Sequence, residues 1–312
     1  MAQEQKTYDV IIIGGSHAGL SAALTLYRAL HTCLIFDDGT PRNALSAQTR
    51  LTSGWENQNP GSFREASRKE LRETGLVEFI FSRAIHAKKV LDDVFEVIDE
   101  AGGKWTSRKI LLATGVIEKY PDIPGYADHY GTTIFNCMFC YGYEQRGATT
   151  AGLLAVGLLS NHAHALTNAR DALKFADTVT IYTDDNQPLA AEILAKLDSG
   201  LHVDNRKVKQ LHGGRDGSGL VIEFDSGEQE SHAFIVHKPD LELDSTLPLQ
   251  LGCELSPGIG VTVNPPFNST TIQGVFAAGD CCSPLRNIPN AMSMGSYAGC
   301  GLARSIPRVA NK

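Results

Sequence analysis

The strongest constraint on the fold comes from a glycine-rich turn near the start of the chain. Residues 8–13 form a short apolar run rich in β-branched side chains, and the sequence GGSHAG at 14–19 follows it directly. An apolar helix face then extends to about residue 30, and residues 32–36 make a second apolar strand that ends at Asp37. Strand, glycine turn, helix, strand and acid together are typical of a βαβ unit that binds a dinucleotide.

Individual residues of this turn have separate expected roles. Gly14 allows the tight turn after the strand, and Gly19 lets the helix pack closely on the sheet. Ser16 is a small substitute for the middle glycine of the pattern, and the backbone amides at the helix N-terminus face a pyrophosphate. Asp37 or Asp38, just past the second strand, supplies the acid of the pattern. We therefore predict a dinucleotide site here.

The remainder of the first hundred residues has a more mixed pattern. Residues 63–75 are expected to form a helix with a solvated charged face. Residues 94–99 and 104–108 flank Ala101-Gly102-Gly103, which predicts a hairpin, and residues 110–113 are expected to form a separate strand before Thr114-Gly115. A linker-like stretch with Pro121 and Pro124 then marks a domain boundary.

A second unit of the same kind is predicted in the middle of the chain. Residues 152–156 and 179–182 are apolar strands, and an alanine-rich helix at about 163–175 separates them. Further strands are expected at 220–224 and 234–237. The sequence therefore predicts an α/β fold with two Rossmann-like nucleotide-binding domains.

The C-terminal segment is too short to make a third domain. It contains the sequence GVFAAGD at 274–280 and a predicted last helix at about 292–306. We expect this segment to fold back onto the first unit. The predicted domains are then residues 1–118 with 244–312, which form a discontinuous first domain, and residues 119–243, which form the second.

Composition limits the classes of partner that the chain can have. Its 312 residues suit two domains of moderate size, and its net charge of −7 argues against nucleic acid or an anionic membrane as a partner. The sequence contains no apolar run of about 18 residues, the length that a membrane-spanning helix needs, so we expect no such helix. The first residues lack the charged-then-apolar pattern of a signal peptide, so we expect an intracellular, cytoplasmic protein.

Two of the seven cysteines, Cys137 and Cys140, stand in a C-x-x-C pattern. A zinc site would need a second pair of ligands at matching spacing, and none is present, so no metal site is predicted. A structural disulfide is uncommon inside cells. A redox role fits best, because two close thiols interconvert with a disulfide through a mixed-disulfide step. The vicinal pair Cys281-Cys282 is expected to be buried by packing.

Two further segments resemble the secondary fingerprints of two-dinucleotide-binding-domain flavoproteins. They are Ala113-Thr114-Gly115 and the run that ends at Gly279-Asp280. In that superfamily the aspartate that matches Asp280 hydrogen-bonds the ribityl chain of FAD. The resemblance therefore implies FAD as the cofactor, with Thr114, Gly115 and Asp280 among its contacts.

The order of these motifs resembles low-molecular-weight thioredoxin reductase over essentially the whole chain. That order is the FAD fingerprint, Ala-Thr-Gly, C-x-x-C, the second βαβ unit and Gly-Asp. The resemblance implies that Cys140 is the thiol beside the flavin and that Cys137 is the interchange thiol that meets the substrate. It also implies a homodimer.

The second unit departs from the thioredoxin-reductase pattern where that family holds NADPH. Its turn is Gly157-Leu158-Leu159, so Leu159 stands where a glycine lets the backbone approach pyrophosphate. The next strand ends at Asp184-Asp185, and two carboxylates repel a 2′-phosphate. We therefore expect a degenerate NADPH-type domain that is kept as a scaffold for the C-x-x-C.

Without a nicotinamide donor, a dithiol must supply the electrons and oxygen is the obvious acceptor. This pattern is similar to the gliotoxin-type dithiol oxidases, which close disulfides in small natural products. The sequences CYGYE at 140–144 and DDGTPRN at 37–43 resemble two of their motifs. The resemblance implies a small-molecule dithiol substrate, with Arg42 expected to pair with an FAD phosphate.

Several alternatives stay open at the level of sequence. Thioredoxin reductases carry an aspartate directly after the second cysteine as acid and base, whereas this chain has Tyr141, with an ordinary pKa near 10. Glu144 or His17 are candidate replacements. The main alternative activity is that of an NADPH-dependent thioredoxin-type reductase, and another is a flavin-loaded redox sensor without turnover.

Overall fold

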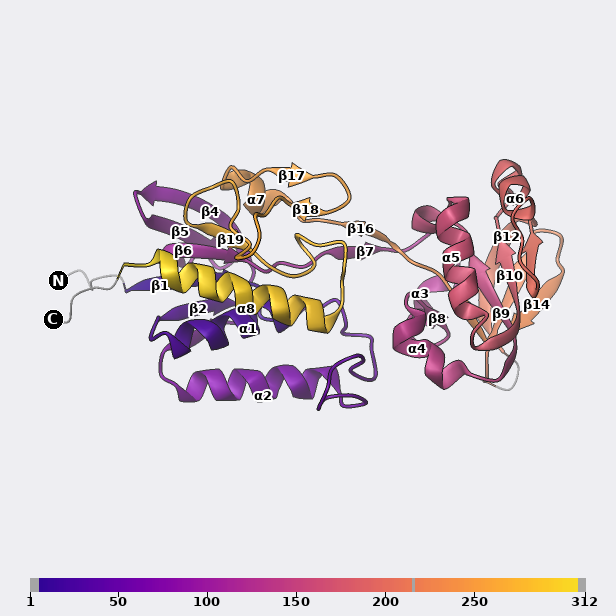
Figure 1. The fold of residues 1–312 in the computed structure, drawn as a ribbon, viewed down its shortest axis with the longest axis horizontal. Coiled ribbons are helices and arrows are strands. Elements are labelled where there is room, and N and C mark those ends of the chain that lie inside the picture. Colours follow the sequence, from indigo (N-terminus) through magenta and orange to yellow (C-terminus); the bar gives the residue numbers. More distant parts are fainter. Residues whose placement is uncertain (1–5, 215–216, 308–312) are drawn as a thin grey trace. The chain divides into compact units, whose positions relative to one another are not determined.

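The computed structural model describes residues 6–214 and 217–307. They divide into two compact units (Figure 1). The first unit takes its described residues from 1–44, 51–117 and 243–312, and the second takes them from 45–50 and 118–242. The short segment 45–50 groups with the second unit, although the sequence pattern placed the whole of 1–118 in the first.

The first unit is built on a sheet in the order β3-β2-β1-β6-β5-β4, with β19 paired to β6. The strands β3, β2, β1, β6 and β19 are parallel neighbours, and β6, β5 and β4 are antiparallel. The strands are β1 (Thr7–Ile13), β2 (Cys33–Phe36), β3 (Val77–Ile80), β4 (Ala84–Leu91), β5 (Val94–Asp99), β6 (Lys104–Leu112) and β19 (Val275–Ala277).

The expected hairpin is present, but residues 110–113 do not form a strand of their own. β5 and β6 pair with Val97 opposite Trp105, and β6 continues without a break to Leu112. The continuation follows from pairing on the other edge, where Ile110 lies opposite Ile11 of β1. An extended strand that has partners on both sides satisfies more backbone groups than two short ones.

Three helices are packed on this sheet: α1 (His17–Arg28), α2 (Pro60–Glu73) and α8 (Ile288–Ser305). Helices α1 and α8 lie side by side (Figure 1), and a Cβ at Gly295 of α8 would collide with the backbone of Ala18 in α1. The C-terminal segment thus folds back onto the first unit, as expected, since Phe276 of β19 lies opposite Leu111 of β6. The same segment contains a short helix, α7 (Thr246–Gln250), which is followed by the strands β17 (Leu255–Ser256) and β18 (Gly260–Val261).

The second unit has a parallel sheet in the order β11-β10-β9-β15-β8. Beside it lies a three-stranded antiparallel sheet, β12-β13-β14. The strands are β8 (Ile134–Phe135), β9 (Ala148–Leu154), β10 (Ala176–Tyr182), β11 (Leu201–Asp204), β12 (Val208–Gly213), β13 (Leu220–Phe224), β14 (Gln229–His232) and β15 (Phe234–Val236). The helices are α3 (Tyr126–His129), α4 (Met138–Gln145), α5 (His162–Ala172) and α6 (Gln187–Leu194).

Two short strands carry the chain between the units in both directions. They are β7 (Ile117–Lys119) and β16 (Asp240–Glu242), which form a two-stranded sheet. In each unit a turn that the sequence singled out follows the carboxyl end of a parallel strand. The turn after β1 leads into α1, and the turn after β9 leads into α5, because a crossover connection places a helix after each strand. Among the described residues, no helix is both long and apolar enough to cross a bilayer.

Candidate functional site

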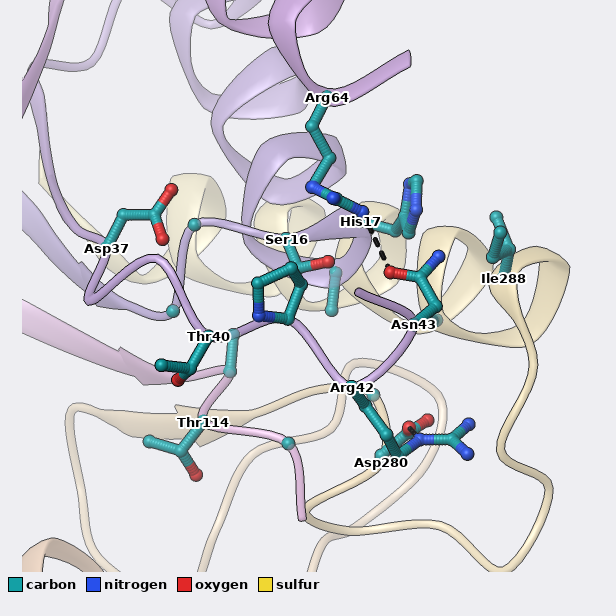
Figure 2. A pocket seen from close by; sticks show the side chains of 18 of the residues that line it. Ser16, His17, Asp37, Thr40, Arg42, Asn43, Arg64, Thr114, Asp280 and Ile288 are labelled. Atoms are coloured by element: carbon teal, nitrogen blue, oxygen red, sulfur yellow. Dashed lines mark hydrogen bonds and ion pairs between the residues drawn. The ribbon is translucent and has the colours of Figure 1, made fainter. Parts of the chain in front are cut away.

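A pocket opens at the carboxyl ends of the parallel strands in the first unit (Figure 2). It brings together all but one of the residues that the sequence assigned to the cofactor. Those lining it are Gly14, Ser16, Asp37, Arg42, Thr114, Gly115 and Asp280, and His17 lies among them. The exception is Gly19, which does not line the pocket but packs against the turn beneath it. A Cβ at Gly19 would collide with the carbonyl oxygen of Gly14.

The glycines of the turn are required by close backbone approach. Gly14 has a φ of 120°, in the region that favours glycine, and a Cβ there would collide with Ala113. A Cβ at Gly15 would collide with the side chain of Asp37. Ser16 caps α1 without a side-chain hydrogen bond, so the first amides of that helix are left for a ligand.

Asp37 lies at the floor of the pocket, where β2 ends. Its Oδ1 accepts a hydrogen bond from the backbone N–H of Gly39 at 3.0 Å, and its Oδ2 pairs with Arg68 of α2. One turn earlier on α2, Arg64 donates to Asn43 Oδ1 at 2.8 Å (Figure 2). Sequence analysis missed both arginines, although their spacing of four residues places them on one face of the helix.

Arg42 and Asp280 form an ion pair, with 2.7 Å between Arg42 Nε and Asp280 Oδ2. Arg42 also donates from Nη2 to the carbonyl oxygen of Arg286 at 2.9 Å. Arg42 is therefore anchored in the pocket wall rather than exposed at a helix start. The pairing keeps a guanidinium and a carboxylate together at one side of the pocket, where a polar ligand can exchange with either group.

Three buried polar atoms of the pocket residues have no hydrogen-bond partner among the described residues. They are His17 Nε2, Thr114 Oγ1 and Arg68 Nε. Only 6% of His17 is exposed, and its burial, together with the charge of Arg64, lowers its pKa to about 4. The imidazole is neutral at pH 7 and can donate or accept one hydrogen bond. Unpaired buried groups are costly, so this pocket fits a ligand with several polar atoms.

The two thiols of the C-x-x-C begin helix α4 in the second unit. Cys137 is the residue before the first turn, and Cys140 lies within that turn. Both are in the thiol form rather than joined in a disulfide, and both are partly exposed. The pKa of Cys137 is lowered to about 7, chiefly by its hydrogen bond with the Cys140 thiol. A thiol with this pKa is about half nucleophilic thiolate at pH 7, far more than an ordinary cysteine.

The three acid–base candidates have different surroundings. The Tyr141 hydroxyl lies 2.8 Å from Ser46 Oγ, and burial raises the pKa of Tyr141 above its ordinary value. Glu144 is 41% exposed in its side chain, and it forms an ion pair of 3.2 Å with Arg50. His17 lines the pocket of the first unit, whereas the thiols belong to the second. Ser46 and Arg50 explain why the segment 45–50 groups with the second unit.

The turn after β9 in the second unit is closed where a dinucleotide would lie. Leu159 is only 1% exposed, and it lies in a short 3₁₀ helix that begins at Gly157. The side chain of Asn161 accepts hydrogen bonds from the backbone N–H groups of Ala163 and His164 at 2.9 and 3.4 Å, respectively. Two of the first amides of α5 are therefore already satisfied.

Acidic side chains also surround this turn. The carboxylate of Asp240 faces Gly157, since a Cβ built there would lie 2.9 Å from Asp240 Oδ1. Asp184 follows β10 and pairs with Lys207 at 2.7 Å. The carboxylate of Asp240 disfavours a phosphate at this turn, whereas the charge of Asp184 is compensated by Lys207.

The vicinal cysteines lie in the core of the first unit, directly after Asp280. Both are buried free thiols, and the Cys281 Sγ–H donates to the carbonyl oxygen of Ala278 at 3.4 Å. Their surroundings are those of packed side chains, as the sequence led us to expect. Among residues 6–214 and 217–307, no group of three or more His, Cys, Asp or Glu side chains gathers as a metal site.

Sequence comparisons match the whole length of this arrangement. A family model described as pyridine nucleotide-disulphide oxidoreductase matches residues 8–295. The thioredoxin reductase tcpT of Claviceps purpurea (strain 20.1) is 39% identical over 297 residues, which cover 93% of this chain and 92% of that protein. The thioredoxin reductase aclD of Aspergillus oryzae is 38% identical over 308 residues, which cover 96% of each.

A solved structure agrees with the fold. The crystal structure of the oxidoreductase from Agrobacterium tumefaciens matches with a TM-score of 0.84 at 27% identity, and the match covers 96% of this chain and 98% of that one. The predicted fold class, α/β with two Rossmann-like domains on the thioredoxin-reductase plan, is confirmed.

Proposed function

The chain belongs to the pyridine nucleotide-disulphide oxidoreductase family and is a thioredoxin-reductase-like enzyme, and from that premise we propose that it is an FAD-dependent dithiol oxidase. It forms a disulfide in a small-molecule dithiol through Cys137 and Cys140, and oxygen accepts the electrons. The chain carries no nicotinamide cofactor in this cycle.

The pocket of the first unit is the proposed FAD site. The open amides after Ser16 and the guanidinium of Arg42 suit the pyrophosphate, Asp37 suits a ribose, and Asp280 suits the ribityl hydroxyls. The unpaired His17 Nε2 and Thr114 Oγ1 give further polar contacts. When bound, FAD supplies a two-electron acceptor for the thiol pair and passes those electrons to oxygen, which yields hydrogen peroxide.

The observation that carries the proposal is the closed turn of the second unit. A nicotinamide dinucleotide needs a glycine turn that approaches its pyrophosphate and helix amides that are free to bind it. Here Leu159 fills the turn and Asn161 already satisfies two of the amides. Electrons that cannot enter from NADPH must enter from the dithiol.

The thiol steps balance without a further reactant. A substrate thiolate attacks Cys137 of the Cys137–Cys140 disulfide, a mixed disulfide forms, and Cys140 leaves as a thiolate. The second substrate thiolate then attacks the sulfur of the first, which closes the substrate disulfide and releases Cys137 as a thiolate. The substrate has lost two electrons and two protons, and the cysteine pair holds the two electrons.

Anaerobic mixing experiments test the direction of electron flow. Dithiothreitol should bleach the oxidised flavin absorbance of the purified protein, whereas NADPH should leave it unchanged on the same time scale. With air admitted, one oxygen molecule should disappear for each disulfide formed. Bleaching by NADPH at a rate similar to that of the dithiol would contradict the proposal and favour an NADPH-dependent reductase. Bleaching by the dithiol without oxygen uptake would favour a redox sensor.

The identity of the cofactor and the assembly are tested separately. The flavin released on denaturation should be FAD, and release of FMN would contradict the assignment of the adenosine side of the pocket to Asp37. The proposed homodimer rests on the resemblance to thioredoxin reductases. Light scattering at micromolar concentration should give twice the mass of the chain, and a monomer mass would refute it.

A further inference from the structure

The carboxyl edge of the second unit's sheet places a basic residue beside the dithiol. Strands β15 and β8 run parallel, with Val236 opposite Phe135. The backbone N–H of His237 donates to the carbonyl oxygen of Phe135 at 3.1 Å, so the pairing continues past the last strand residues. In this register Lys238, two residues after Val236, lies level with Cys137, two residues after Phe135. The two residues leave the sheet as neighbours.

The charge of Lys238 is not neutralised by an acidic partner within the described residues. Other lysines of this unit are paired, since Lys174 Nζ lies 2.6 Å from Asp171 and Lys207 Nζ lies 2.7 Å from Asp184. Lys238 is partly buried and forms no ion pair within residues 6–214 and 217–307. A partly buried, uncompensated cation acts on its neighbours with little screening.

The other ionisable groups around Cys137 are neutral at pH 7 or already paired, so they do not mask the charge of Lys238. From α4 the thiol faces Cys140 and Tyr141, and burial raises the pKa of Tyr141, so its phenol stays neutral. Arg50 is held in its ion pair with Glu144 of the same helix. From the sheet edge, burial lowers the pKa of His237 to about 4, so it is neutral at pH 7. Lys238 is the full positive charge at that edge that acts on Cys137.

We propose that Lys238 is a positioning residue of the redox centre, whose ammonium holds Cys137 as a thiolate so that the Cys137–Cys140 disulfide can re-form. The inference rests on the proposed function. In that step the two thiolate sulfurs join and the cysteine pair gives two electrons to the flavin cofactor. The two protons that the substrate dithiol lost on forming its thiolates are taken up with those electrons when oxygen becomes hydrogen peroxide. The nucleophile in disulfide formation is a thiolate, so its availability sets the rate.

The electrostatic surroundings of Cys137 agree with this role. The pKa of Cys137 is lowered chiefly by the Cys140 thiol, against the opposing effect of burial. The backbone N–H groups of Cys140 and Phe139 and the charge of Lys238 lower it further. Lys238 is the contributor to this lowering that a side-chain substitution outside the C-x-x-C can remove.

The test measures the thiolate directly, in the full chain and without oxygen. In a Cys140→Ser background, the rate at which iodoacetamide alkylates Cys137 is followed by peptide mass across pH 5–10. Adding Lys238→Met should slow alkylation at pH 7 by about threefold to tenfold and move the profile to higher pH, whereas Lys238→Arg should keep it. Lys207→Met is the matched control, because it removes a lysine of the same unit that is already paired with Asp184.

The outcomes separate this inference from the proposed function. An unchanged profile in Lys238→Met, or an equal shift in Lys207→Met, overturns the role of Lys238. A shifted profile in a protein that consumes no oxygen with any dithiol supports Lys238 and contradicts the oxidase alone. In the chain with both cysteines, Lys238→Met should lower dithiol oxidation most below pH 8 and least at pH 9, where Cys137 ionises without help.

Discussion

The two units carry the same strand–turn–helix motif, and they differ in what satisfies the first turn of the helix. In the first unit Ser16 makes no capping hydrogen bond, and the turn opens on the pocket. In the second, the side chain of Asn161 accepts hydrogen bonds from two backbone N–H groups of the helix, and the buried side chain of Leu159 fills the turn. A helix N-terminus attracts an anion only while its amides lack partners. The capping side chain of Asn161 thus takes up amides that the first turn leaves available to a ligand.

The two turns also differ in the charged groups around them. The pocket of the first unit is lined by Arg42, Arg64 and Arg68 together with three aspartates, so it offers guanidinium groups to an anion. At the second turn the carboxylate of Asp240 faces Gly157. The two differences act on the same ligand atoms, since phosphate oxygens need both donors and positive charge. This difference supports our proposal that the first unit holds the nucleotide cofactor and that the second serves as a support for the thiols.

The largest expected effect tests whether turnover belongs to the thiols of the second unit. Cys137→Ser and Cys140→Ser should each lower dithiol oxidation by at least about a thousandfold, because exchange needs both an attacked and a leaving sulfur. Both variants should keep their flavin. Cys137→Ser alone should show a long-wavelength charge-transfer band from the Cys140 thiolate, which fades as pH falls below the pKa of that thiol. A band in Cys140→Ser alone would reverse the two roles.

A matched pair of glycine substitutions compares the two turns directly. Gly15→Ala places a Cβ against Asp37, so we expect FAD affinity to fall about a hundredfold, or roughly 3 kcal/mol. Gly157→Ala at the second turn places a Cβ against the side chain of Asp240 and strains a backbone φ of 53°, but FAD affinity should stay within about threefold because the strain lies in the other unit. Ultrafiltration with flavin fluorescence gives both values. Equal losses in the two variants would show that the second turn also takes part in cofactor binding.

The buried histidines give a pH test of smaller size. The folded pKa of His17 is about 4, below its ordinary value of 6.5, so the unfolded chain binds the extra proton first as pH falls. Stability is therefore lost between about pH 6.5 and 4, by up to about 3 kcal/mol for this group. In flavin-free protein, His17→Phe should lose less stability than the native chain when urea unfolding at pH 7 and at pH 4.5 is compared. An equal loss in both proteins would exclude His17 as a source.

The smallest expected effect concerns Glu144, a candidate base from the sequence. Its carboxylate is partly exposed and paired with Arg50, and such pairs contribute less than about 1 kcal/mol. Glu144→Gln should leave dithiol oxidation within about threefold at pH 7–9 and should lower the unfolding midpoint by only a few degrees. A fall in turnover of about a hundredfold with an unchanged midpoint would instead assign the base to Glu144.

The sequence predicted the segments that carry a recognisable local motif. It did not indicate the residues whose role depends on which distant parts of the chain the fold brings together. The glycine turn and the return of the segment that ends at Asp280 follow from local patterns. Arg64 and Arg68 belong to a helix whose charges suggested only a solvated face, because sequence does not show which face meets a pocket. Lys238 becomes relevant only through the register of two short strands, which no local pattern specifies.

The pairing of Arg42 with Asp280 has a consequence for how the protein is made. These residues are 238 positions apart, so the cofactor pocket lacks one wall until nearly the whole chain has left the ribosome. The second unit ends near residue 242 and can collapse before the last strand and helix of the first unit are synthesised. Flavin loading must then follow translation, and a nascent chain stalled before residue 274 would carry a folded thiol unit but bind no flavin.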